Sequence, residues 1–384
     1  MQDPRILARL PQIPAPSIPD LSFSSPLGRW AGIGPYYAMF PVPFAFDVIA
    51  RYSKPGGAVL DPFAGRGSSI YAAVGQGRTG YGVEIHPVGW LYGTVKLAPA
   101  AKGWVLKRVE EIGELARRVT KSKLDKLPDF FHVCYCHDVL KYLIAARTHL
   151  RWETSRVDAT LMAIILVNLH GKRNSCLSNQ MRQGKAMSPD YSVRWWKDRK
   201  MSPPEIDPIK FLNTRVSWRY AKGLPKLGRG HIERGDSTTV LKRLGAYRHY
   251  TGAPKFDLLF TSPPYLGLTN YFYDQWLRMW MLGGPSAPLA SGKSWENKFE
   301  SKVEYRRLLE KVFQGCAENL TNDAVVYIRT DARQFTLETT CEILKETFPK
   351  KYMYMVGRPF TKATQTALYG DKTTKPGEID IIMQ

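Results

Sequence analysis

The residues best suited to chemistry stand in TSPPY, at positions 261–265, directly after an apolar run. Two consecutive prolines lack backbone N–H donors, so the carbonyl oxygens of this corner remain free to accept hydrogen bonds. Ser262 adds a hydroxyl acceptor and Tyr265 adds an aromatic face. An amino group on a planar ring needs such acceptors and such a platform. A plain strand-ending turn is the alternative. We predict these catalytic residues: Ser262, Pro263, Pro264 and Tyr265.

A second candidate is the glycine-rich string LDPFAGRGSS, which also follows an apolar run. Its glycines allow a ligand to approach the backbone closely. Glu84 stands 23 residues after Asp61, where an acid can accept hydrogen bonds from both hydroxyls of a ribose. The next glycine after Gly67 is Gly75, so the pattern is not G-x-G-x-x-G. We therefore expect a nucleoside cofactor with a short tail rather than a dinucleotide; an ordinary tight turn is the alternative.

The elements around these motifs predict an α/β fold with a parallel sheet. An apolar strand at 57–63, a helix with Ser68 as its N-cap that runs to about Val74, and a strand at 79–85 form a βαβ unit. Three further strands are predicted at 256–260, 324–328 and 379–383, and two helices at 305–319 and 337–347. Helices on both faces would cover the sheet, and a mostly helical insertion would interrupt it.

The charge of the chain favours a polyanionic partner. Its 384 residues carry 55 Lys and Arg against 34 Asp and Glu, a net charge of +21. Nucleic acid is the first candidate and an anionic membrane surface the second. Residues 171–230 hold 14 basic and 4 acidic side chains, about half of this surplus. We predict that these residues bind DNA: Lys172, Arg173, Arg182, Lys185, Arg194, Trp195 and Arg199.

We divide the chain at the ends of the basic stretch. The prediction is an extended arm at 1–30, a catalytic domain at 31–100 and 231–384, and an inserted target-recognition region at 101–230. For the Trp pair at 195 and 196, burial in the core is an equally good expectation.

Cysteine usage and hydropathy indicate a cytoplasmic protein. The five cysteines are sparse and odd in number, which does not suggest a disulfide framework. The cluster HVCYCH at 132–137 is too cramped for a zinc site, and no metal is predicted. The apolar stretch 161–169 is too short to span a membrane and predicts a buried helix.

The two motifs together resemble those of the S-adenosylmethionine-dependent DNA amino-methyltransferases. DPFAGRG looks like their cofactor motif, and TSPPY looks like their catalytic motif, in which a first Ser is most typical of cytosine-N4 enzymes. Residues 34–49 look like their N-terminal cofactor motif, and GDS at 235–237 looks like the piece that contacts adenine. The resemblance implies these cofactor-binding residues: Tyr37, Phe40, Asp61, Phe63, Gly65, Gly67, Glu84 and Asp236.

The same resemblance implies a Rossmann-like methyltransferase sheet and S-adenosyl-L-methionine as cofactor. It further implies methylation of cytosine N4 in double-stranded DNA after base flipping, in a restriction-modification or related system. A cognate restriction endonuclease is a candidate partner, and we expect the protein to be associated with the nucleoid. One departure from the family is that the large insertion precedes GDS.

Three alternatives remain open at this level: an adenine-N6 DNA methyltransferase, an RNA amino-methyltransferase, and an inactive DNA-binding relative. Methylation of cytosine carbon 5 is disfavoured, because that chemistry typically uses a Pro-Cys pair and no Cys here follows a Pro.

Overall fold

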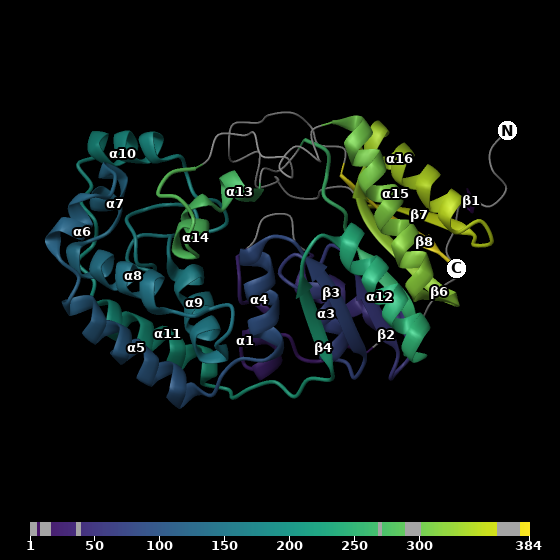
Figure 1. Cartoon of the computed structure of the whole chain (residues 1–384), viewed down its shortest axis with the longest axis horizontal. Coiled ribbons are helices and arrows are strands. Elements are labelled where there is room, and N and C mark those ends of the chain that lie inside the picture. The colour runs from purple at the N-terminus through teal and green to yellow at the C-terminus, as the bar shows by residue number, and fades with distance from the viewer. Residues whose placement is uncertain (1–5, 8–16, 36–39, 268–270, 289–300, 359–376) are drawn as a thin grey trace.

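A single mixed sheet organises the chain (Figure 1). The computed structural model describes residues 6–7, 17–35, 40–267, 271–288, 301–358 and 377–384. Within them the sheet has eight strands in the order β1-β7-β8-β6-β5-β2-β3-β4. The strands are β1 Ile6–Leu7, β2 Ala58–Asp61, β3 Thr79–Glu84, β4 Gly230–Arg234, β5 Phe256–Thr261, β6 Leu320–Asp331, β7 Met353–Arg358 and β8 Glu378–Met383. Neighbours run parallel except β8, which is antiparallel to both β6 and β7.

Helices cover both faces of this sheet, as expected. Along β5, Leu258 and Phe260 belong to one apolar core, while Leu259 belongs to the other. Successive strand residues point to opposite faces, so a run buried throughout indicates that both faces are covered. On one side lie α12 (Ser237–Thr251), α15 (Lys302–Asn319) and α16 (Gln334–Thr347), in front of the sheet in Figure 1. The other core includes α2 (Val42–Tyr52), α3 (Ser68–Val74) and α4 (Pro87–Leu97).

The predicted α/β class and its Rossmann-like βαβ unit are confirmed. The chain passes from β2 through α3 to β3, which pairs in parallel with β2. One detail differs at the start of α3: Gly67, with φ of 72°, is the N-cap, and Ser68 is already helical. The left-handed conformation is easier for glycine than for serine, which moves the cap back by one residue.

The insertion is a helical bundle beside the sheet, drawn at the left of Figure 1. Its helices are α5 Lys102–Arg117, α6 Lys121–Asp125, α7 Asp129–Cys134, α8 His137–His149, α9 Arg156–Asn168, α10 Pro189–Asp198 and α11 Pro208–Tyr220. The apolar stretch 161–169 forms most of α9 and is buried, as predicted. No helix among the described residues is long and apolar enough to cross a membrane.

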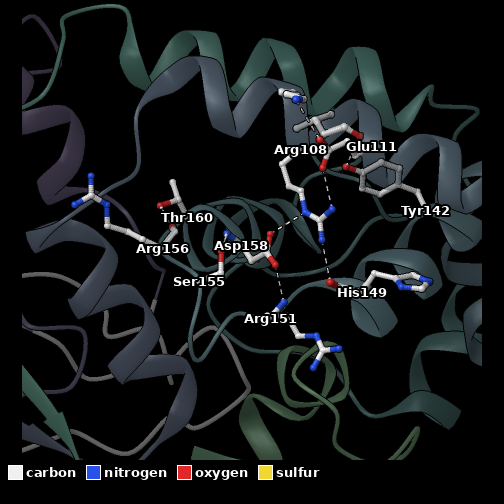
Figure 2. A network of polar contacts seen from close by, with 11 residues as sticks. Arg108, Glu111, Tyr142, His149, Arg151, Ser155, Arg156, Asp158 and Thr160 are labelled. Carbon is white, nitrogen blue, oxygen red and sulfur yellow. Dashed lines mark hydrogen bonds and ion pairs between the residues drawn. The ribbon is translucent and has the colours of Figure 1, made fainter.

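Polar contacts lock the bundle internally (Figure 2). Arg108 on α5 donates to Asp158 at 2.8 Å, to Glu111 at 2.9 Å and to the His149 carbonyl at 3.0 Å. Asp158 also accepts from the Arg151 backbone amide at 2.8 Å. These bonds fix the turn between α8 and α9 against α5, so the insertion has its own rigid framework.

Two segments lie differently from the simplest expectation. Within the arm, Pro26–Ala31 forms helix α1, because Ser25 caps it and Trp30 is fully buried against Tyr220. Beyond TSPPY, α13 (Tyr271–Asp274) and α14 (Trp276–Met281) pack with the insertion. The Trp276 indole donates to the Met187 carbonyl at 3.1 Å. The bundle is thus completed by a segment that lies after TSPPY in the sequence.

Candidate active site

The sequence motifs meet at one edge of the sheet. Asp61 ends β2, Glu84 ends β3, Asp236 follows β4 and Ser262 follows β5. These four strands are neighbours in the order β5-β2-β3-β4 and run parallel. Carboxyl ends of parallel strands share an edge, where α/β proteins commonly bind ligands. The structure therefore brings the predicted cofactor and catalytic motifs together.

Asp61 connects the two motifs directly. Its carboxylate accepts from the Thr261 hydroxyl at 2.5 Å, from the Phe63 amide at 3.0 Å and from the Ser69 hydroxyl. Burial raises its pKa to about 6, against the lowering effect of these donors. All three partners are protein groups, so the Asp61 side chain links the glycine turn to TSPPY through hydrogen bonds.

Glu84 holds the glycine turn from the other side. Its two carboxylate oxygens accept from the Gly65 amide at 2.6 Å and from the His86 amide at 2.7 Å. Burial raises its pKa to about 7. A carboxylate oxygen has two acceptor positions, so each can still receive one ribose hydroxyl. The ribose contact of Glu84 stays a prediction, and its bond to the Gly65 amide was not predicted from the sequence.

The glycine turn itself requires its glycines. Gly65 and Gly67 have φ of 54° and 72°. A Cβ on Gly67 would lie 2.5 Å from the Ile232 side chain, whereas a Cβ on Gly65 would meet no atom within 4 Å. The open side of Gly65 is therefore where a ligand can approach the backbone.

Arg66, between these glycines, was not anticipated from the sequence. It is buried and donates to the Gly34 carbonyl at 3.0 Å. Burial lowers its pKa to about 10. The bond fixes the start of the segment that resembles the N-terminal cofactor motif; within it, Tyr37 lies outside the described residues.

The other predicted cofactor residues have structural contacts of their own. Phe40 is buried and stacks on Phe260 with ring centroids 4.6 Å apart. Phe63 is half-buried against the core beneath α12, α15 and α16. Asp236 caps α12 by accepting from the Thr238 amide at 2.9 Å. Both Phe40 and Asp236 thus shape this edge of the sheet through contacts within the protein.

The TSPPY corner has a second long-range contact, which runs through Tyr265. Pro263 and Pro264 are buried, and the Ser262 hydroxyl donates to the Tyr265 oxygen at 3.4 Å. Tyr265 in turn donates to Glu378, at the start of β8, at 3.0 Å. Burial, and then the Glu378 carboxylate, raise the pKa of Tyr265 well above its ordinary value. No local pattern around Glu378 indicated this contact.

Some of the predicted DNA-binding residues are exposed, and others bond to groups within the protein. Lys172, Arg182, Arg194 and Arg199 are exposed, and the Arg199 guanidinium lies 4.3 Å over the half-buried ring of Trp195. Arg173 donates to the Ser202 carbonyl at 3.1 Å.

Lys185 differs most from its predicted role, because it forms an ion pair with Asp274 at 2.5 Å. Asp274 is only 4 % exposed, so the charge of Lys185 compensates a buried carboxylate. Trp196 is fully buried and donates to the Gln180 carbonyl at 2.8 Å, so it is a core residue, whereas Trp195 is only half-buried.

The cysteine cluster at 132–137 is divided by the fold. Cys134 and Cys136 are buried, whereas His132 and His137 are exposed. Among the residues that the structure describes, no three His, Cys, Asp or Glu side chains are grouped to hold a metal ion.

Comparison with known proteins gives one family match. Residues 17–88 match the family model described as DNA methylase, the N6/N4 type. The matched stretch contains α2, β2, the glycine turn, β3 and Glu84, and it supports S-adenosylmethionine as the cofactor. TSPPY lies outside it. No curated protein matches the chain.

Among solved structures, an rRNA methyltransferase from Streptomyces viridochromogenes is 14 % identical, with a TM-score of 0.35 over 94 % of this chain and 91 % of that one. A TehB-like SAM-dependent methyltransferase from Corynebacterium glutamicum is 10 % identical, with a TM-score of 0.27 over 92 % of this chain and 90 % of that one. Likeness at this level carries no argument about activity or substrate.

The geometry leads to a prediction for cofactor binding. Glu84→Gln should weaken S-adenosylmethionine binding roughly 10- to 100-fold, because hydrogen bonds to a charged group contribute about 1.5–3 kcal/mol. Glutamine keeps one acceptor oxygen, for either the Gly65 amide or the His86 amide, whereas alanine would leave both amides without one. Calorimetric titration measures the affinity, and the melting temperature shows how far the loss of one of these bonds destabilises the turn.

The pH dependence of this affinity follows from the raised pKa of Glu84, about 7. Ribose hydroxyls donate to the ionised carboxylate, so binding must release the proton that Glu84 holds at lower pH. Affinity should therefore rise, at most about tenfold per pH unit, as the pH approaches 7 and level off above it. The Gln variant should lose this dependence; parental affinity and pH profile in that variant would contradict the assignment.

Proposed function

We propose that the protein transfers a methyl group from S-adenosylmethionine to the exocyclic amino nitrogen of cytosine in double-stranded DNA. The observation that carries this proposal is the 2.5 Å bond between Thr261 and Asp61. Thr261 and Asp61 end adjacent parallel strands, which supports a common site for the proposed cofactor turn and amino-binding corner. The DNA methylase match over residues 17–88 supports the amino-methylating chemistry.

The residues of the chain would act mainly by orientation and by placing acceptors. S-adenosylmethionine supplies an electrophilic methyl group when it is bound. The lone pair of the cytosine amino nitrogen is delocalised into the ring, which makes it a poor nucleophile. Ser262 Oγ and the Pro263 carbonyl would accept the two amino hydrogens and favour a pyramidal nitrogen. Orientation and preorganised acceptors together account for large accelerations in enzymes.

Double-stranded DNA is the partner that charge and surface favour. The net charge is +21, and Arg194 in α10 and Arg199 directly after it are exposed near Trp195. Basic groups neutralise phosphates, and an aromatic ring can stack on or wedge against a base. The target base would have to leave the duplex to reach Ser262, with Tyr265 as its platform.

Nucleoside analysis tests the proposal. The purified protein, S-adenosylmethionine and duplex DNA would be incubated, and the DNA digested and examined by mass spectrometry. N4-methylcytosine is the expected product. N6-methyladenine would support the adenine-specific alternative, and methylation of RNA alone would support the RNA alternative. Cofactor and DNA binding without any product would identify an inactive relative.

A further inference from the structure

A chain of hydrogen bonds leads from the catalytic corner to a carboxylate on another strand. The Ser262 hydroxyl donates to Tyr265 at 3.4 Å, and Tyr265 donates to Glu378 Oε1 at 3.0 Å. Each link donates in the same direction, away from the position that the target base would occupy. Such bonds are often long in unliganded sites and tighten when substrate binds.

Glu378 is held firmly at the end of this chain. It begins β8, opposite Asp331 of β6, and Arg329 lies 3.5 Å from its other oxygen. Arg329 is fixed by two bonds to the buried Asp380, at 2.7 and 2.9 Å. Asp380 also accepts from Tyr327 and Arg358, each at 2.8 Å. A polar cluster across β6, β7 and β8 therefore positions the carboxylate.

Amino methylation creates a need for such a group. When the nitrogen attacks, the N–C bond forms and the C–S bond breaks, and the bonding electron pair of the latter stays on sulfur. The product nitrogen is then positively charged and carries one proton more than the neutral methylamino group. Ser262 can receive that proton only if it passes on its own.

We propose that Glu378 is the terminal acceptor of this proton, which reaches it through Ser262 and Tyr265. The nitrogen gives a proton to Ser262 Oγ, the Ser262 proton moves to Tyr265, and the Tyr265 proton moves to Glu378. Glu378 becomes a neutral acid, and Ser262 and Tyr265 end as they began, so atoms and charge balance. The inference rests on the proposed function. Glu378 touches no substrate and is a positioning and relay residue.

The test separates a relay from a simple clamp on Tyr265. Glu378→Gln keeps an oxygen that accepts from Tyr265 but cannot take up a proton. It should lower kcat roughly 100-fold, the lower end of the range for proton-transfer groups, with KM for DNA unchanged. Tyr265→Phe should cause a similar loss in kcat. The double variant should be no slower than the slower single variant, because both changes interrupt one path.

Glu318→Gln is the matched control, since it makes the same substitution at an exposed position in α15, outside the relay and the cluster around Asp380; it should keep parental kcat. Parental kcat in Glu378→Gln, or losses that multiply in the double variant, would overturn the relay while the proposed function stands. A parental enzyme that methylates no amino group would overturn both.

Carbon-13 NMR of labelled tyrosines gives a readout that does not depend on activity. The Tyr265 signal is identified by its absence in Tyr265→Phe. It should shift in Glu378→Gln because the acceptor changes from a carboxylate to an amide, and it should stay in place in Glu318→Gln. An unmoved signal in Glu378→Gln would show that the bond does not exist in solution and would overturn the inference.

Discussion

Replacement of Ser262 by alanine should lower kcat for DNA methylation about 10²- to 10³-fold, with S-adenosylmethionine affinity within about twofold of the parent. Loss of one preorganised polar group at a reacting centre commonly costs this much. The Ser262 hydroxyl contacts Tyr265, whereas the link to the cofactor turn runs through Thr261. Single-turnover kinetics would measure the chemical step, and calorimetry would measure cofactor affinity.

Thr261→Val is the contrasting variant one residue earlier. Thr261 is fully buried and donates to Asp61 at 2.5 Å. Its loss deprives a buried carboxylate of a donor, which typically costs about 1–3 kcal/mol of stability. We therefore expect a lower melting temperature and weaker cofactor binding from Thr261→Val, and a loss of turnover alone from Ser262→Ala. A Ser262→Ala protein with parental kcat would place the reacting group elsewhere.

The parts of the site that the sequence predicted are those carried by contiguous motifs. The strand, glycine turn, helix and strand between Ala58 and Glu84 form a local unit, and each piece has its own pattern of apolar and glycine residues. TSPPY likewise follows directly on β5. Parallel strands bring their carboxyl ends to one edge, so the proximity of these motifs follows from the sequence pattern alone.

Contacts between distant segments could not be predicted in this way. Glu378 has no local pattern that marks it, and it reaches Tyr265 only because β8 enters the sheet antiparallel, beside β6. An arginine in a glycine turn is expected to face solvent, but Arg66 is buried and donates to the Gly34 carbonyl, 32 positions earlier in the sequence. Strand β7 was not predicted, since only its first residue, Met353, is buried.

In the insertion, the charge pattern of the sequence did not show which basic side chains are paired within the protein. Charge counting correctly identified a basic helical segment, but it cannot tell a free lysine from a paired one. Lys185 pairs with Asp274, which stands 89 positions later in the sequence. Neutralising Lys185 would leave a buried carboxylate without its cation, which is destabilising in itself. A loss of DNA binding in such a variant would therefore not report on DNA contact.

The exposed face of α10 allows a cleaner test of DNA binding. Arg194, Lys197 and Arg199 are exposed. Changing all three to glutamine should weaken DNA binding roughly 10- to 100-fold near physiological salt and flatten the slope of log affinity against log salt by about 2 to 3. Each phosphate contact releases counterions and contributes about 0.9 to that slope. Fluorescence anisotropy with one duplex across a salt series measures both quantities.

A matched triple variant distinguishes local contact from overall charge. Lys54, Lys311 and Lys350 are also exposed, and they lie after α2, in α15 and after α16, away from the insertion. Changing these three to glutamine removes the same charge, so it should leave the salt slope near the parental value. Equal flattening in both triples would mean that DNA responds only to the net charge of +21. A parental slope in the α10 triple would contradict its assignment to the DNA interface.

Comparing different DNA sequences separates phosphate contact from base recognition by the same helix. A side chain that binds phosphate weakens affinity for all sequences alike, whereas one that reads a base edge relaxes the preference at one position. The Arg199 guanidinium lies 4.3 Å over the Trp195 ring, which restricts where it can lie, and Arg194 stands five residues earlier, within α10. We therefore expect Arg199→Gln to relax specificity and Lys197→Gln to lower affinity uniformly. Uniform weakening in both single variants would leave α10 with phosphate contacts only.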